Sequence, residues 1–255
     1  MKSVAVIAMA TLLLLAGCSK SNQHPTGMNG QPNVEPAIKT FSYSAADNPN
    51  NPLDSVGKLH NILLDSLRKY VKRTNDTTHA GRGYYLSYLA KTFWNYDYIP
   101  TKNEALERKI CIDYKSVMLV DTFSVQAKNF ITQMISVLEG IESTQEFSLY
   151  AQKIRSIEQN IGSAGLPVIE QKYLFVVASL LRHSGYYWMD QFEQGYVTQK
   201  AGIFGFLRKV AGVIAGIAAD ATTAGYHYLK NSPIDHLVIE SAWMSEVCGY
   251  YTGWY

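Results

Sequence analysis

Hydrophobic residues recur at steps of three and four along most of the chain after residue 51, which is the spacing of one face of an α-helix. The first such face consists of Val56, Leu59, Leu63, Leu67 and Tyr70. The same spacing predicts further helices over about 123–141, 147–161 and 169–180. An aromatic-rich helix is expected over 84–96, and the start signal Ser232-Pro233-Ile234-Asp235 predicts a last helix that reaches about residue 247. Regular alternation, the pattern of strands, is scarce. The pattern therefore predicts an all-α bundle of seven or eight helices.

Local signals mark where several of these helices begin. Asn51-Pro52-Leu53-Asp54 places a capping asparagine before a proline in the first turn. The segments 101–104 and 143–146 each put a hydroxyl three residues before a glutamate, as in a capping box. Residues 108–120 fit either a helix or a strand, and the pattern leaves both open.

The first residues have the pattern of an export signal. Lys2 precedes an apolar run from Val4 to Ala16, which is shorter than the roughly 20 residues of a membrane-spanning helix. The run ends in Leu15-Ala16-Gly17-Cys18, which resembles the lipobox of bacterial lipoprotein precursors. The resemblance implies that residues 1–17 are a signal peptide and that acyl chains on Cys18 bind the bilayer. Ser19 instead of aspartate favours, by the same resemblance, the outer membrane of a Gram-negative cell.

Residues 18–51 are rich in Asn, Pro, Gly, Ser and Gln. Such a segment buries too little apolar surface to offset its ordering entropy. We expect a flexible lipidated tether with a reach of roughly 30 Å. A single helical domain over 52–255 would follow it.

Composition limits the partners. The formal net charge is +2 for the whole chain, and removal of Lys2 with the signal peptide lowers it by one. A nearly neutral protein gives no electrostatic reason to expect nucleic acid. The 18 tyrosines suit either a core or a surface that contacts a protein or a glycan.

Two cysteines remain once Cys18 is acylated. Cys111 and Cys248 would lie in an oxidising compartment, where a disulfide persists. Sequence alone leaves two interpretations open, which are a disulfide and a pair of buried thiols.

The segment 201–225 is unusually rich in small residues. Gly212 and Gly216 form a G-x-x-x-G motif, which lets two helix backbones approach closely. The same face continues into a polar stripe of Asp220, Thr223 and His227. Three hypotheses follow: a central helix with hydrogen-bonded polar residues, a segment that touches a bilayer, and a ligand or catalytic site.

Catalytic and metal-binding motifs are missing from the sequence, including H-E-x-x-H, C-x-x-C, G-x-S-x-G and the P-loop. No two of the 6 histidines are three or four residues apart, as helical metal ligands would be. The sequence therefore predicts no metal and no cofactor, and His60 is expected to be structural.

Three functions remain as hypotheses. The first is a non-enzymatic binding or structural module of the envelope. The second is an envelope hydrolase or glycan-processing enzyme that uses acids such as Asp190, Glu193 or Asp220. The third is a membrane-active protein that uses residues 201–225. The segment from Asn51 to Asn61 resembles helical envelope lipoproteins of Gram-negative bacteria, a likeness that implies no particular activity.

Overall fold

A computed structural model describes residues 45–100, 103–141, 147–193 and 203–252, with only the main chain at 147–148, 192–193, 203–211 and 249–252. All of the regular structure in these residues is helical, which confirms the all-α prediction and the expected number of helices. The eight helices described are α2 (Asp54–Thr74), α3 (His79–Trp94), α4 (Glu104–Met118), α5 (Val125–Glu139), α6 (Phe147–Ser163), α7 (Val168–Glu193), α8 (Ile203–Leu229) and α9 (Ile234–Thr252).

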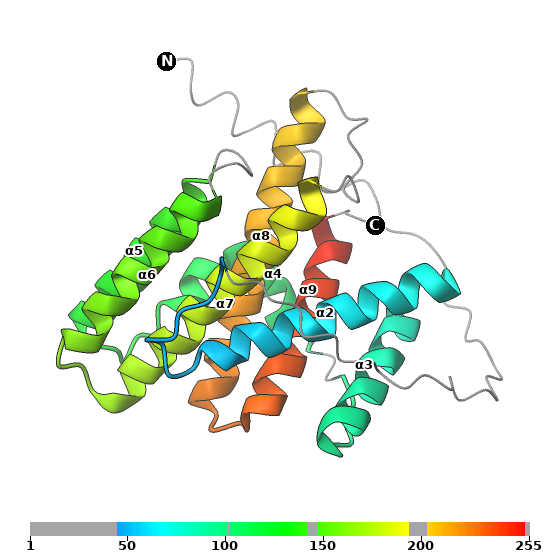
Figure 1. Ribbon diagram of the computed structural model, residues 1–255, viewed down its shortest axis with the longest axis horizontal. Helices are drawn as coiled ribbons and strands as arrows, with labels where there is room; N and C mark the ends of the chain where they lie inside the picture. The colour runs from blue at the N-terminus through cyan, green and yellow to red at the C-terminus, as the bar shows by residue number, and fades with distance from the viewer. Residues whose placement is uncertain (1–44, 101–102, 142–146, 194–202, 253–255) are drawn as a thin grey trace. The chain divides into compact units, whose positions relative to one another are not determined.

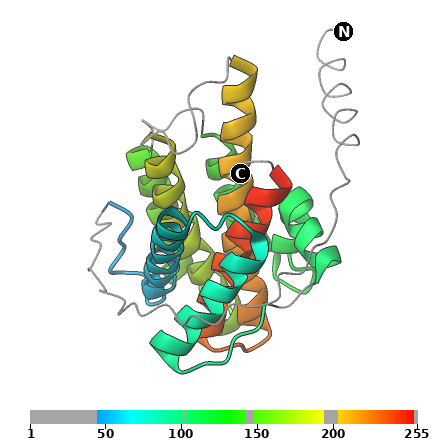
Figure 2. The ribbon, with the colours of Figure 1, turned by 90° about the vertical axis from the view of Figure 1, so that its right-hand side faces the viewer.

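Helix α8 is the central element of the body. It packs along α7, α9 and α4, while α2 crosses α7 and α9 (Figure 1). Figure 2 shows α4 on one side of α8, and α7 with the α5–α6 pair on the other. Since α8 is covered on several sides, its Gly212 and Gly216 are buried. The small-residue face thus serves packing inside the body.

Helix ends follow local chemistry, although several lie away from the expected positions. Helix α2 begins at Asp54, and Asn51 Oδ1 instead accepts from the Leu53 N–H at 2.8 Å. Helix α3 begins well before the expected residue 84, because Thr78 caps it by accepting from the Gly81 N–H. The hydroxyls expected to cap at 101 and 143 lie outside the described residues.

The strand considered for residues 108–120 is wrong. This segment lies mostly in α4, which bends at Asp113 (φ −136°, ψ 52°). The bend interrupts the helical spacing of apolar residues, and this explains why the pattern was ambiguous. Asn103 caps α4 by accepting from the Leu106 N–H at 3.2 Å.

A glycine lets α2 approach α7 closely. A Cβ atom on Gly57 would lie 2.7 Å from the Ser179 carbonyl oxygen and 2.6 Å from His183 Cδ2. The Gly57 N–H donates to Ser179 Oγ at 3.0 Å. This approach brings the polar residues of α2 against those of α7.

Helices α4 and α9 are joined covalently. Cys111 and Cys248 form a disulfide, with their Cα atoms 5.5 Å apart. Of the two interpretations left open by the sequence, the disulfide is the one in the structure.

Candidate functional site

Residues 45–53, here called the strap, are fixed to α6 and α7 by side-chain amides. Asn48 Nδ2 donates to Glu158 Oε2 at 2.7 Å, and Asn51 Nδ2 donates to Glu158 Oε1 at 2.6 Å. Asn51 also donates to the carbonyl of Phe175 at 2.9 Å. The expected boundary between tether and domain at residue 51 is therefore too late, because the strap belongs to the folded body.

Arg182 of α7 is the centre of these contacts and is fully buried. Its Nε and Nη2 donate to the two oxygens of Glu158, both at 2.9 Å, and Nη2 also donates to Asp54 Oδ1 at 2.6 Å. Its Nη1 donates to the carbonyl of Ala46 in the strap. A buried ion pair is stable only when its groups are fully hydrogen-bonded, as they are here. The strap cluster consists of Asn48, Asn51, Asp54, Glu158, Arg182 and His183.

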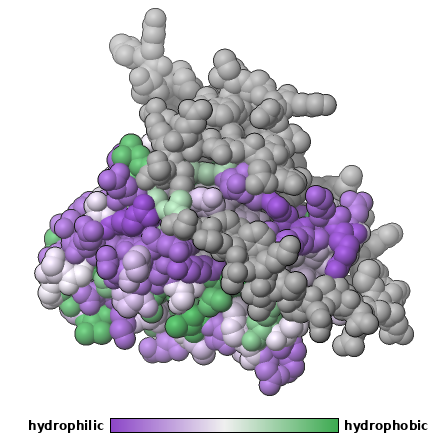
Figure 3. All heavy atoms as spheres, viewed as in Figure 1, coloured by the Kyte–Doolittle hydropathy of each residue, from purple (hydrophilic) through white to green (hydrophobic). Residues whose placement is uncertain are grey.

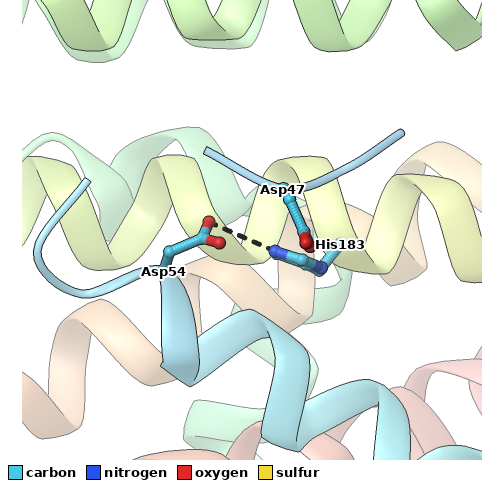
Figure 4. A group of neighbouring side chains, drawn as sticks. All are labelled: Asp47, Asp54 and His183. Atoms are coloured by element: carbon cyan, nitrogen blue, oxygen red, sulfur yellow. Dashed lines mark hydrogen bonds and ion pairs between the residues drawn. The ribbon is translucent and has the colours of Figure 1, made fainter. Parts of the chain in front are cut away.

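His183 completes this cluster from α7. Its Nε2 lies 3.2 Å from Asp54 Oδ1 (Figure 4). Burial lowers the pKa of His183, although the hydrogen bond with Asp54 opposes that shift, so the ring is neutral at pH 7. Burial alone would raise the pKa of Asp54, but the His183 hydrogen bond and the Arg182 charge hold it well below its usual range. Asp54 is thus ionised, and His183 Nε2–H donates to it.

Three side chains at the outer edge of the strap cluster have the atoms of a metal site. Asp47, Asp54 and His183 each offer a ligand atom, and these atoms lie within 4.8 Å of one another. Carboxylates and a neutral imidazole suit a divalent transition metal. However, Lys58 Nζ lies 3.2 Å from an oxygen of each aspartate, and Arg182 occupies the other oxygen of Asp54. The cations of the chain already pair with these carboxylates, so the group fits an ion-pair network better than a metal centre.

A second polar group, here called the core cluster, lies among α2, α7, α8 and α9. Ser184 Oγ donates to Asp220 Oδ2 at 2.5 Å, and Ser245 Oγ donates to Oδ1. Trp188 Nε1 donates to Oδ2 at 3.4 Å. His60 Nε2 lies 3.4 Å from the same oxygen, and the side chains of His60 and Asp220 are 0% exposed. These donors replace the water that a carboxylate loses on burial.

The proton position on His60 follows from its neighbour Asn61. Asn61 Nδ2 donates to the carbonyl of His183 at 2.7 Å, so Asn61 Oδ1 is the acceptor end of the amide. This oxygen lies 3.1 Å from His60 Nδ1, which must therefore carry a proton. His60 Nε2 then faces Asp220 Oδ2.

The core cluster has the residue types of a nucleophilic triad but not its arrangement. In a triad the imidazole lies between hydroxyl and carboxylate and takes the hydroxyl proton. Here Ser184 and Ser245 donate directly to Asp220, which leaves their protons directed away from His60. The arrangement supports packing of four helices better than attack on a substrate.

The predicted polar stripe does not converge on one site. Asp220 belongs to the core cluster, and the buried Thr223 hydroxyl has no hydrogen-bond partner. His227 lies further along α8, where its ring stacks on that of His236 with centroids 5.0 Å apart. Burial and the charges of His236 and Lys230 lower the pKa of His227 to about 4.

The acids considered for hydrolysis do not meet either. Asp190 lies near the end of α7, where its Oδ2 accepts from Gln191 Nε2 at 3.4 Å, whereas Asp220 is bonded within the core cluster. The side chain of Glu193 and the whole of Cys18 lie outside the described part of the structure.

No protein-family model, curated protein or solved structure matches the chain. Within the residues described, none of the helices has both the length and the apolar character that a membrane crossing requires.

His60 and Asp220 stand out in the sequence, but neither the strap cluster nor the core cluster could be predicted from it. Their members come from segments far apart in the chain, and no fixed spacing links them. One signal was present: the segment Asn48-Pro49-Asn50-Asn51 comes directly before the first apolar face.

Proposed function

We propose that the protein is a lipid-anchored module of a bacterial envelope whose helical body binds or braces another envelope component without catalysing a reaction. The observation that carries this proposal is the strap. The chain that follows the lipobox and the Asn/Pro-rich spacer is fixed to the body through buried Glu158 and Arg182. A mechanical force on the lipid anchor would thus be transmitted from the strap to α6 and α7 through its hydrogen bonds with Glu158 and Arg182.

The anchor itself is proposed from the sequence. Acyl chains on Cys18 would contribute about 0.8 kcal/mol for each buried methylene group, so the attachment would be stable. Ser19 favours the outer membrane of a Gram-negative cell. Besides the bilayer, the proposed partner is a protein or a glycan, since the nearly neutral charge does not favour nucleic acid.

The two other hypotheses have less support. A hydrolase would need accessible converging acids or an activated nucleophile, whereas the core cluster is closed to solvent and bonded internally. A membrane-active role for α8 would require its small-residue face to be free, whereas Gly212 and Gly216 are buried in the body.

The test of this proposal is acylation at Cys18 in the native host. Cys18→Ala should abolish incorporation of labelled palmitate and release the protein from the membrane fraction. Cys111→Ser is the matched control, because it removes a disulfide cysteine and should leave the palmitate label intact. A Cys18→Ala protein that still carries the label, or stays in the membrane fraction, would overturn the proposal.

Protease treatment of intact and then permeabilised cells would place the body on one side of the membrane. Digestion on intact cells would direct the partner search to environmental proteins and glycans. Protection until permeabilisation would direct it to periplasmic proteins and peptidoglycan.

A further inference from the structure

Three exposed β-branched side chains lie at one corner of the body, where the α6–α7 connection meets the start of α5. Val125 is 75% exposed, Val168 65% and Ile169 46%. The Ser124 N–H and Oγ donate to the carboxylate of Glu170, at 2.8 and 2.6 Å. Because these bonds hold the chain neighbours of Val125 and Ile169 together, the three exposed residues lie at the same end of the body, and this end is here called the apolar corner. Figure 3 shows hydrophobic surface at this end of the body, at the lower left.

The apolar corner is held rigidly. Ser124 Oγ also caps α5 by accepting from the Ala127 N–H at 3.2 Å. Gln171 Nε2 of α7 donates to the carbonyl of Ile161 at 3.3 Å, which fixes the end of α6 against the start of α7. A surface that is already ordered loses little conformational entropy when it binds.

Two lysines lie one helical turn behind the apolar corner. Lys128 follows Val125 by three residues in α5, and Lys172 follows Ile169 by three residues in α7. Residues three apart share a helix face. Lys172 is exposed, whereas Lys128 Nζ donates to the carbonyl of Asp121, an exposed acid beside the corner. Apolar side chains at a tip with lysines behind them match a bilayer interface, where lysine ammonium groups reach phosphates.

The segment that follows the proposed anchor enters the described body beside α6. Arg155 of α6 donates to the carbonyl of Ala45 at 2.8 Å, so the tether meets the body beside α6. Helix α6 continues from Arg155 to Ser163, about 12 Å at 1.5 Å per residue. A flexible chain with the number of residues between Cys18 and Ala45 would reach roughly 30 Å. The tether is therefore long enough to let the corner rest on the bilayer that holds the acyl chains.

We propose that the apolar corner of Val125, Val168 and Ile169 seats in the interfacial layer of the bilayer to which Cys18 is attached. This inference rests on the proposed lipid anchor. The contact fixes which end of the body faces the membrane.

The test uses the acylated protein in vesicles of phosphatidylethanolamine and phosphatidylglycerol that contain a lipid with a nitroxide on its acyl chain. An environment-sensitive fluorophore is attached to Val168→Cys. It labels this cysteine alone, because Cys18 would be acylated and Cys111 and Cys248 are bonded to each other. Leu149→Cys is the matched control: it is 47% exposed on the same helix pair but at the opposite end of α6. We expect quenching of about twofold or more at position 168 and little at position 149. Adding Ile169→Asp should remove most of the quenching at position 168.

The outcomes separate the two proposals. Equal quenching at both positions, or none at position 168 in protein that floats with the vesicles, would overturn the corner contact alone. If the fluorophore at position 168 is shielded from solvent on native envelopes but is not quenched by the nitroxide lipid in vesicles, the corner contacts a protein and the proposed bilayer contact is wrong. Protein that carries no acyl chain by mass spectrometry and fails to float would overturn the proposed function.

Discussion

The strap cluster and the core cluster both contain carboxylates buried in the helical body, but they stabilise these carboxylates in different ways. The strap cluster uses the guanidinium of Arg182 to pair both Asp54 and Glu158. The core cluster places Asp220 among hydroxyls, an indole and an imidazole, which have no permanent charge. The first joins a segment without regular structure to the body, and the second joins helices to one another.

The difference shows what a guanidinium and a set of hydroxyl donors each contribute. A guanidinium offers five donors in a fixed plane, so one arginine orders α2, α6, α7 and the strap together. Hydroxyl donors are weaker but rotate to suit, so they tolerate the tight packing around Asp220. We infer that the strap cluster sets how the tether is attached, while the core cluster sets the packing of α2, α7, α8 and α9.

The largest effect is expected from Arg182→Met, which leaves buried Glu158 without its cation and leaves Asp54 paired with Lys58 alone. The free energy of unfolding should fall by about 3–5 kcal/mol, measured by urea denaturation. Arg155→Met is the control, because Arg155 donates to strap carbonyls from a partly exposed position and should cost about 1 kcal/mol. Equal losses for the two variants would contradict the central role of Arg182.

The second-largest loss of stability is expected from substitutions in the core cluster. Asp220→Asn replaces a carboxylate oxygen by an amide donor that faces hydroxyl and indole donors, and should cost about 2–3 kcal/mol. Ser245→Ala should cost about 1–2 kcal/mol, more than Ser241→Ala, whose hydroxyl bonds only the carbonyl of Val238 in its own helix. A larger loss for Ser241→Ala would contradict the assigned bond to Asp220.

Gly57→Ala should disturb the strap cluster at the contact of α2 with α7, because the added methyl group meets Ser179 and His183. We expect a loss of about 1–3 kcal/mol from overpacking. Gly162→Ala in α6 is the control, since a Cβ there meets no atom within 4 Å. A neutral Gly57→Ala would show that α2 and α7 do not approach as described.

The smallest expected effect is on pH dependence. The pKa of His183 is lowered in the folded protein, so unfolding takes up a proton and stability falls as pH drops below about 6.5. Asp54, whose folded pKa is also lowered, adds a further loss as pH falls below about 4. His183→Gln should flatten the upper part of this decline. His227 contributes with the same sign, so His227→Gln is measured alongside.

The helices could be predicted from sequence because their causes are local. Apolar spacing located α2, α5, α6 and α7, and a start signal located α9. Helix α2 ends at Asn75, whose φ is 55°. Helix α3 was placed too late because its first turn, rich in small residues, has no apolar stripe. Helix α4 was not recognised as a helix because it bends at Asp113.

The clusters could not be predicted because their causes are long-range. The strap carries few apolar residues, so its composition indicated a tether. Its order comes from long-range contacts, which are its amides with Glu158 and its carbonyls with Arg182 and Arg155. Asp220 was recognised as unusual, but nothing in the sequence linked it to Ser184, Ser245 or His60.

The central claim is that the strap is part of the folded body, and amide hydrogen exchange of residues 46–54 in the full protein tests it most directly. Three of its N–H groups, at Asn48, Asn51 and Asp54, are hydrogen-bonded within the strap and the start of α2. The account predicts that these amides exchange slowly, and that Arg182→Met accelerates them while α8 stays protected. Exchange of the strap in the unaltered protein at the rate of an unstructured peptide would contradict it.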